Sequence, residues 1–201
     1  MAEISNNSNK IWKTIGASNH TDKERQVDDF YATDPIAIDK LITKFNLPEV
    51  IYEPCCGQGH LAKRLEELGH RVYATDLVDR GYGQGDVDFM QVKELPNDCK
   101  CILTNPPYKI AMEVILHALN ILPPDGICAM FLKTTFLEGS KRYQHLFSVH
   151  PPKYLFQFSN RVLCAKNADF EGMKAGGGSA VSYMWAIFTP ENKNLPIVDW
   201  I

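Results

Sequence analysis

The sequence predicts an α/β fold, built on a doubly wound and mostly parallel sheet with an antiparallel strand pair at one edge near the C-terminus. Short apolar runs alternate with longer segments of helical periodicity along most of the chain. One run, Ile127–Leu132, is almost continuously apolar, which is typical of a strand covered on both faces. The last two apolar runs have no helix between them, so we expect them to pair antiparallel.

The first regular element is a helix expected over residues 35–45. Its apolar residues recur at helical spacing, and Pro35 suits the first turn, with Thr33 or Asp34 as the N-cap. Further helices are expected over His60–Leu68, Ile110–Leu122 and Tyr143–Val149. Strands are expected at Val50–Tyr52, Val72–Thr75, Cys101–Thr104, Ile127–Leu132, Tyr154–Phe158 and Val181–Phe188. A loop of about twenty residues joins the last two strands, and loops of that length in a compact domain are usually functional or mobile.

The composition is that of a single globular domain of 201 residues, 45% hydrophobic and 22% charged. Residues 1–25 are polar, so we expect a flexible N-terminal segment there and one domain over residues 26–201. No apolar run approaches the ~20 residues that span a bilayer, and the N-terminus lacks the basic-then-apolar order of a signal peptide. We therefore expect a cytoplasmic protein with no membrane partner. The sequence leaves the oligomeric state open.

The spacing of the cysteines and the distribution of charge bear on metal binding and on nucleic-acid binding. The six cysteines lack the paired C-x-x-C spacing of zinc sites, so we predict reduced thiols and no metal. The net charge of −3 argues against unselective coating of nucleic acid. Residues 126–180 nevertheless hold seven Lys or Arg against three Asp or Glu, a balance of +4 that leaves −7 for the rest of the chain. This asymmetry is compatible with one face that meets phosphates, and equally with scattered solvated lysines.

Two motifs are placed to bind a small molecule, because ligands of open α/β sheets lie outside the carboxyl ends of the strands. The stretch Glu-Pro-Cys-Cys-Gly-Gln-Gly, from Glu53 to Gly59, follows the first strand and opens a helix. Its glycines, Gly57 and Gly59, let the backbone approach a ligand closely, and Glu53 offers a carboxylate to a cationic amino group. Asp76 ends the second strand about twenty residues later, where an acidic residue accepts hydrogen bonds from ribose hydroxyls in nucleoside-cofactor sites. Taken singly, each motif is also common as a tight turn or a solvated strand end.

The most specific motif is Asn105-Pro106-Pro107-Tyr108, which directly follows the strand at residues 101–104. The two prolines stiffen the turn and carry no N–H, so its carbonyls are free to accept hydrogen bonds. With the amide of Asn105 and the ring of Tyr108, the turn suits a planar group that bears an amino substituent. The three motifs, in one order along one sheet edge, are far less frequent together by chance than singly.

On these motifs the chain resembles the S-adenosylmethionine-dependent adenine-N6 DNA methyltransferases, most closely their short phage and prophage members. The resemblance begins at about Trp12 and has less specific matches at Asp29–Pro35 and Phe136–Gly139. It implies a Rossmann-like methyltransferase fold, S-adenosyl-L-methionine as cofactor, DNA as partner, and methyl transfer to the exocyclic N6 of adenine. The implied cofactor-binding residues are Tyr31, Thr33, Pro35, Glu53, Gly57, Gly59, Asp76, Asp88 and Phe89. The implied catalytic residues are Asn105, Pro106 and Tyr108, and the implied substrate-binding residues are Pro107, Tyr108 and Phe170.

The resemblance also implies a role for each group. Residues 31–35 would flank the methionine part of the cofactor, and residues 53–59 would hold its amino and carboxylate region. Asp76 would bind the ribose, and residues 88–89 its adenine. Asn105 and the Pro106 carbonyl would accept hydrogen bonds from the target amino group, with Tyr108 stacked on the target base. Phe170 is a candidate second wall for that base, although a phenylalanine of a mobile loop is the more ordinary interpretation.

We expect no separate target-recognition domain, which would be a departure from the family, because only sixteen residues follow Trp185. We expect base recognition to come from the loop at residues 161–180, to be lax, or to belong to a partner. Asn-Pro-Pro-Tyr also occurs in methyltransferases that act on adenine in RNA or on the glutamine amide of release factors. A non-catalytic nucleotide- or DNA-binding module with the same fold is a third alternative.

Overall fold

The computed structural model describes residues 31–201, apart from residues 97 and 167. A seven-stranded sheet runs through it in the order β3-β2-β4-β5-β8-β6-β9. Its strands are β2 (Val50–Glu53), β3 (Arg71–Ala74), β4 (Cys101–Thr104), β5 (Ile127–Lys133), β6 (Tyr154–Gln157), β8 (Tyr183–Phe188) and β9 (Ile197–Trp200). The helices are α2 (Ile36–Ile42), α3 (His60–Glu67), η2 (Phe89–Gln91), α4 (Ala111–Ile121), η3 (Thr134–Leu137), α5 (Ser140–Arg142), η4 (Tyr143–Phe147) and α6 (Phe170–Ala175).

The strand directions confirm the predicted fold class. Strands β3, β2, β4 and β5 run parallel, whereas β8 runs antiparallel to both β5 and β6. The antiparallel pairing of the last two predicted strands is therefore confirmed as well. The outermost position differs from the prediction, because β9 pairs in parallel with β6 and takes the edge. Side chains of β9 are exposed on both faces, so its sequence has no apolar alternation that would predict a strand.

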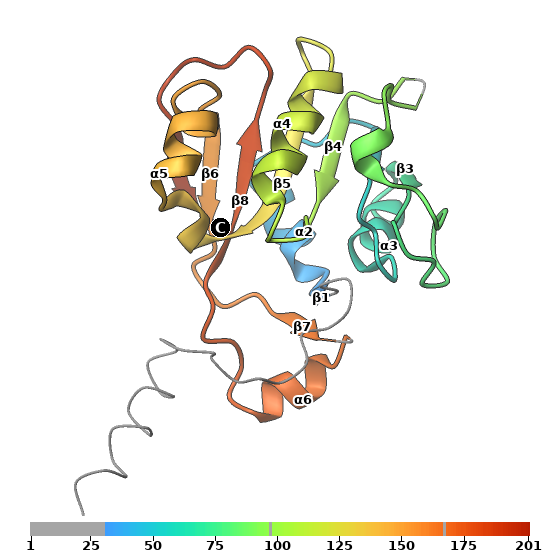
Figure 1. Cartoon of the computed structure of the whole chain (residues 1–201). Coiled ribbons are helices and arrows are strands. Elements are labelled where there is room, and N and C mark those ends of the chain that lie inside the picture. The colour runs from blue at the N-terminus through green and yellow to red at the C-terminus, as the bar shows by residue number, and fades with distance from the viewer. Residues whose placement is uncertain (1–30, 97, 167) are drawn as a thin grey trace, which may run out of the picture.

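Successive side chains of each strand alternate between two cores, one on each face of the sheet. Ile51 and Phe131 pack in the core that α2 and α3 cover. Ile102 and Met130 pack in the core that α4 covers. The fully buried Trp185 of β8 also donates from its indole Nε1 to the carbonyl of a residue in α2, at 2.9 Å. Figure 1 shows the resulting three layers, with helices on both sides of the strands.

A second, two-stranded sheet lies beside the main one. Strand β1 (Tyr31–Thr33) pairs antiparallel with β7 (Cys164–Lys166), and we call this pair the β1–β7 ribbon. Strand β7 and helix α6 belong to the long segment between β6 and β8, for which the sequence predicts only a loop. In Figure 1 the ribbon and α6 lie below the main sheet, at the end to which β4 points. The ribbon therefore stands at the carboxyl edge of the parallel strands.

Two further expectations concern the N-terminal segment and a membrane-spanning helix. The flexible segment predicted for residues 1–25, and the motif residues before Tyr31, lie outside the described residues. In the described residues, no helix has both the length and the apolar character that crossing a membrane requires.

Candidate functional site

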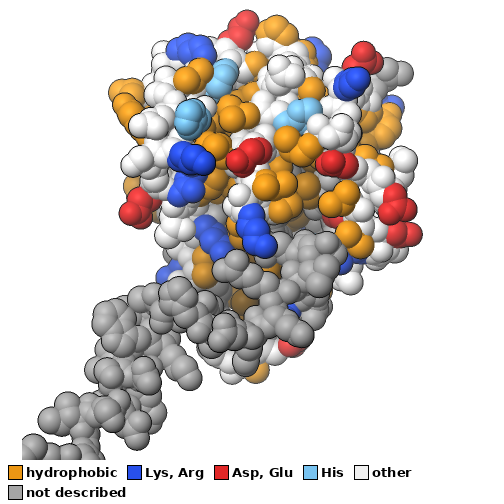
Figure 2. Space-filling view, in the orientation of Figure 1, with side chains coloured by type: hydrophobic (Ala, Val, Ile, Leu, Met, Phe, Trp, Pro, Cys, Tyr) orange, Lys and Arg blue, Asp and Glu red, His pale blue; other side chains and the backbone are white. Residues whose placement is uncertain are grey.

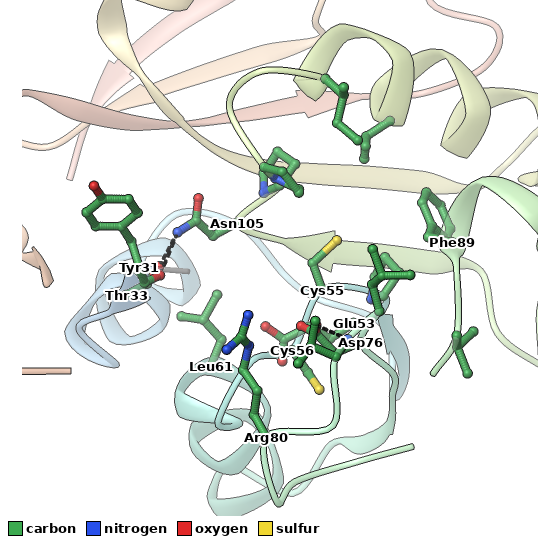
Figure 3. Close-up of a pocket in the computed structure, with 18 of the residues that line it drawn as sticks. Tyr31, Thr33, Glu53, Cys55, Cys56, Leu61, Asp76, Arg80, Phe89 and Asn105 are labelled. Atoms are coloured by element: carbon green, nitrogen blue, oxygen red, sulfur yellow. Dashed lines mark hydrogen bonds between the residues drawn. The ribbon is translucent and has the colours of Figure 1, made fainter. Parts of the chain in front are cut away.

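A cavity of about 310 Å³ opens at the carboxyl ends of β2, β3 and β4, a volume within the range of small-molecule sites. Most of the predicted site residues line it, namely Tyr31, Thr33, Glu53, Asp76, Asp88, Phe89, Asn105, Pro106, Pro107 and Tyr108. Figure 3 shows Asn105 beside Tyr31 and Thr33 on one side of the cavity, with Glu53 and Asp76 on the other. The three motifs of the sequence thus meet at one edge of the sheet.

Four of the predicted site residues do not line the cavity: Pro35, Gly57, Gly59 and Phe170. Pro35 starts α2, and its carbonyl accepts a hydrogen bond from the N–H of Ile38. Phe170 starts α6, and its ring meets that of His60 edge-on at 5.6 Å. Because His60 itself lines the cavity, Phe170 stands one residue behind the wall. The predicted ligand contacts of these four residues stay predictions.

The glycine turn is locked to Asp76. Gly57 and Gly59 have φ values of 55° and 77°, in the left-handed region that favours glycine. The N–H of Gly57 donates to Asp76 Oδ2 at 2.8 Å, and the N–H of Gly59 donates to the carbonyl of Cys56 at 2.8 Å. Asp76 Oδ1 accepts from the N–H of Val78 at 3.0 Å. Each carboxylate oxygen of Asp76 still has a lone pair for a ligand hydroxyl, whereas both glycine N–H groups are already used.

Glu53 places a carboxyl group in the cavity wall with almost no access to water. Its exposed fraction is 2%, and its Oε2 has no hydrogen-bond partner in the described part of the chain. Burial raises the pKa of Glu53 well above its ordinary value, and the negative charges of Asp76 and Glu66 add to this, while a hydrogen bond from the Ala62 backbone opposes it. A cation bound beside Oε2 would satisfy this group.

The amide of Asn105 is held in one orientation by the β1–β7 ribbon. Its Nδ2 donates to Thr33 Oγ1 at 2.9 Å and to the Tyr31 carbonyl at 3.3 Å. A carbonyl can only accept, so the nitrogen of the amide must face the ribbon. The opposite atom, Asn105 Oδ1, is buried and has no partner among the described residues. An unpaired buried polar atom costs about 1–3 kcal/mol, which makes this oxygen a ready acceptor for an N–H donor.

Tyr108 is fixed from several directions. Its ring stacks on that of Tyr183, with centroids 6.4 Å apart and an interplanar angle of 28°. Lys133 Nζ lies 4.4 Å from its centroid, and its hydroxyl lies 3.6 Å from Cys164 Sγ. Lys133 and Tyr183 are register partners on β5 and β8. Burial raises the pKa of Tyr108, so the phenol stays protonated and serves as a rigid aromatic platform.

Asp88 and Phe89 lie where the cavity meets η2. Asp88 Oδ1 accepts from the N–H of Met90 at 2.9 Å and caps this short helix. Phe89 is 4% exposed and meets the rings of Tyr52 and His117 edge-on. These contacts hold an acidic side chain and an aromatic ring together in the cavity wall.

Several cavity residues are not among those predicted from the sequence: Cys55, Cys56, His60, Leu61 and Arg80. Burial raises the pKa of both thiols, that of Cys56 to about 12, so neither is a nucleophile near neutral pH. One feature of the sequence could have identified Arg80 as a site residue: it is a basic residue in the glycine-rich loop that follows Asp76. No three His, Cys, Asp or Glu side chains of the described residues gather as a metal site.

Comparisons with known proteins reveal a shared fold. No family model matches the chain, and neither does any curated protein sequence. A protein from Lactococcus lactis, provisionally named a hemolysin, has a TM-score of 0.58 at 11% identity, over 82% of this chain and 91% of its own. The modification subunit of a provisionally named type I restriction enzyme from Vibrio vulnificus has a TM-score of 0.57 at 11% identity, over 96% of this chain and 50% of that subunit. A ribosomal protein L11 methylase from Lactobacillus delbrueckii subsp. bulgaricus has a TM-score of 0.52 at 14% identity, over 78% of this chain and 77% of the methylase.

Proposed function

We propose that this protein is an S-adenosylmethionine-dependent methyltransferase that acts on the exocyclic N6 of adenine in DNA. The observation that carries the proposal is the Asn105 amide, whose Oδ1 is oriented, buried beside the cavity and without a partner in the described part of the chain. Buried polar atoms are nearly always hydrogen-bonded, so an exception in a cavity wall indicates a ligand that pairs with it. The fold, shared with a protein named as a methylase, agrees with this proposal.

The cavity wall offers a partner for each part of S-adenosylmethionine. Glu53 Oε2 would pair with the ammonium of the methionine moiety, and Asp76 would accept hydrogen bonds from the ribose hydroxyls. Asp88 and Phe89 would hold the adenine by its amino edge and its ring. When bound, the cofactor supplies a methyl group that is already activated by its positive sulfonium.

The Asn105 turn would prepare the nitrogen that receives the methyl group. The lone pair of an exocyclic adenine amino group is delocalised into the ring, which makes it a poor nucleophile. Asn105 Oδ1 and the Pro106 carbonyl, both acceptors, would draw the amino hydrogens out of the ring plane and so favour a more nucleophilic nitrogen. Because the ribbon holds the amide in place, this arrangement needs no reorganisation during the reaction.

Tyr108 would receive the base. Swinging a base out of a duplex costs a few kcal/mol. Stacking on an aromatic ring returns ~1–3 kcal/mol per base, and Tyr108 is held ready for it by Tyr183 and Lys133. The remaining gain comes from alignment of the amino nitrogen with the methyl group.

DNA as the substrate is supported by cations near the ribbon. Lys166 lies opposite Tyr31 in the ribbon, and Arg161 lies a few residues before β7. Both side chains are exposed, and neither pairs with a carboxylate of the described residues. Figure 2 shows further Lys and Arg side chains at the left and centre of this face, above the grey residues. Phosphates of a nucleic acid are the natural partner of such a group.

A methyl-transfer assay tests the proposal. The protein is incubated with radiolabelled cofactor and, separately, with DNA, RNA and a release factor, and the products are digested and identified. We expect the label in N6-methyladenine from DNA. If the label appeared only in RNA or on a glutamine amide, the proposed substrate would be wrong, but the proposed methyl transfer would stand. No label on any substrate, with no calorimetric binding of millimolar cofactor, would overturn the proposal.

A further inference from the structure

Arg80 is a cation in the cavity that the proposed function leaves unused. It lines the cavity together with Glu53 and Leu61. Figure 3 shows its side chain rising from its loop into the cavity, beside Leu61 and on the same side as Glu53. Arginine binds carboxylates and phosphates through two parallel hydrogen bonds, so its presence at this wall raises the question of an anionic ligand group.

The loop that carries Arg80 is closed at its base by backbone pairing. Thr75 and Gln84 form a β-bridge just beyond the end of β3. The N–H of Asp76 donates to the Gln84 carbonyl at 3.0 Å, and the N–H of Gln84 donates to the Ala74 carbonyl at 2.9 Å. The two ends of the loop are therefore fixed beside the same Asp76 that closes the glycine turn.

The far part of the loop is docked on α3 through Tyr82. The Tyr82 ring packs so closely over Gly59 that a Cβ there would lie 2.3 Å from a ring carbon. The Tyr82 hydroxyl donates to Glu66 at 3.0 Å, and Lys63 Nζ lies 4.9 Å from the ring centroid. Because both the base of the loop and its Tyr82 part are held, the fold sets the direction in which the Arg80 side chain points.

The methionine end of the cofactor carries a carboxylate as well as an ammonium. Glu53 suits the ammonium, but the N–H groups of Gly57 and Gly59, which the sequence predicts for this region, already donate to Asp76 and to Cys56. The carboxylate therefore requires another donor.

Among the described residues, three that can carry a positive charge line the cavity: Arg80, Lys109 and His60. Burial lowers the pKa of His60, and Lys63 adds to this while Asp34 opposes it, so His60 is mainly neutral near pH 7. Lys109 is exposed and directly follows Tyr108, on the side expected to receive the target base. Of these three described residues, Arg80 is the one that stands on the Glu53 wall, where a carboxylate next to the paired ammonium would lie.

We propose that Arg80 binds the α-carboxylate of the cofactor's methionine moiety, an inference that rests on the proposed function. Together with Glu53 it would hold both charges of the amino acid end. Two fixed points at that end set the direction of the sulfonium, and with it the path of the methyl group toward Asn105.

The test compares two ligands that differ only in the carboxylate: S-adenosylhomocysteine and its decarboxylated analogue, measured by calorimetry on the full chain. We expect Arg80→Gln to weaken S-adenosylhomocysteine binding about tenfold or more, as the loss of a charge-assisted hydrogen bond requires. Affinity for the decarboxylated analogue should change less than about twofold. Arg80→Lys should restore part of the loss, because it keeps the charge but not the paired geometry.

Lys109→Gln is the matched control, since it removes one positive charge from the same cavity. It should leave the difference between the two ligands as in the wild type. An equal loss for both ligands in Arg80→Gln would reduce Arg80 to a support of its loop and overturn the inference. No loss for either ligand, or a carboxylate-selective loss in Lys109→Gln instead, would overturn it too. Wild-type protein that binds neither ligand would contradict the proposed function itself, and the two failures are thereby told apart. If Arg80→Gln does not fold, the two ligands measured on Arg80→Lys decide the question in the same way.

Discussion

Asn105 and Glu53 each bury a polar oxygen that has no hydrogen-bond partner in the described residues. A buried polar atom without a partner usually destabilises the folded protein, because it loses its hydrogen bonds to water and forms none inside. Here both oxygens border one cavity, and they suit the two amino groups that a methyl transfer to adenine would bring there. The sequence predicts both residues from their motifs. The orphaned oxygens add a physical reason that the motifs alone lack.

Cofactor binding should depend on pH through Glu53. In the free protein, burial raises the pKa of Glu53 well above the ordinary 4.5, so the carboxyl stays protonated into a range where a solvated one is ionised. An ammonium stabilises the carboxylate and lowers this pKa, so binding releases a proton. Affinity for S-adenosylhomocysteine should therefore rise with pH up to the raised pKa of Glu53 and level off above it. Calorimetry in buffers of different ionisation enthalpy measures both the affinity and the proton.

The same shift has an opposite consequence for the free protein. The folded state holds the proton of Glu53 more tightly than the unfolded state. The contribution of Glu53 to the free energy of unfolding is therefore fully present at pH values below the ordinary pKa of a glutamate. It is lost as pH rises toward the raised pKa. Glu53→Gln should flatten both profiles. If the affinity of the wild type did not change with pH, and that of Glu53→Gln were the same, Glu53 would not be the group that binds the ammonium.

Among the elements, the β1–β7 ribbon has the most direct influence on the site. It supplies three acceptors for Asn105 Nδ2, namely the Tyr31 carbonyl, Thr33 Oγ1 and Cys164 Sγ, and the Cys164 thiol also lies 3.6 Å from the Tyr108 hydroxyl. The ribbon joins a segment near the start of the described chain to one far along it, with Tyr31 opposite Lys166. The orientation of the amide is thus a property of tertiary pairing.

Thr33→Val tests this dependence. The substitution keeps the branched shape of a buried residue but removes the Oγ1 acceptor, which is the nearest of the three, so Asn105 Nδ2 keeps the Tyr31 carbonyl at 3.3 Å and Cys164 Sγ at 3.5 Å. We expect kcat at saturating cofactor to fall about tenfold, the equivalent of one hydrogen bond of ~1.4 kcal/mol. Thr33→Ser keeps the hydroxyl and should retain most of the activity. Equal rates for Thr33→Val and Thr33→Ser would show that the ribbon does not orient the amide.

The sequence predicts the elements of the main sheet well, because its strands and covering helices carry regular apolar patterns. Cys101–Thr104 and Ile127–Lys133 are buried on both faces and read as strands without ambiguity. Strands β1 and β7 have only three residues each, and neither strand β9 nor helix α6 buries a side chain. Their structure depends on partners distant in sequence, so no local pattern announces them.

At the scale of the whole molecule, the parallel sheet gathers at one edge the motifs that the sequence separates. Glu53 is the last residue of β2 and Asn105 directly follows β4, and these two strands are neighbours in the sheet. For this reason the order of motifs along the chain was enough to predict their meeting point. Arg80 and Cys164 could not be predicted in the same way. Their positions depend on how the loop after β3 docks on α3 and how β7 pairs with β1.

The uneven charge of the molecule predicts salt-dependent DNA binding. The net charge is −3, yet residues 126–180 carry an excess of four positive charges. We expect the logarithm of the association constant to fall linearly with the logarithm of salt concentration, with a slope of about −0.9 for each phosphate contact. Removing two cations in the Arg161→Gln, Lys166→Gln double variant should make the slope less negative by up to about 2. Fluorescence anisotropy with a short duplex measures it.

The control removes two cations from the other edge of the sheet, in the Lys100→Gln, Lys153→Gln double variant. These residues directly precede β4 and β6, at the amino ends of those strands. The slope of this variant should equal that of the wild type. If both double variants changed the slope alike, net charge rather than a face beside the ribbon would control binding.

The central claim is that Asn105 and the cofactor cavity act on one amino group, and single-turnover methylation of DNA by Asn105→Ala tests it most directly. With wild-type protein we expect the label in N6-methyladenine. Asn105→Ala should lower the rate about 10²- to 10³-fold, as loss of a preorganised group does, with S-adenosylhomocysteine affinity nearly unchanged. Asn120→Ala, on the exposed side of α4, should keep the wild-type rate. A rate for Asn105→Ala equal to that of the wild type would contradict the account.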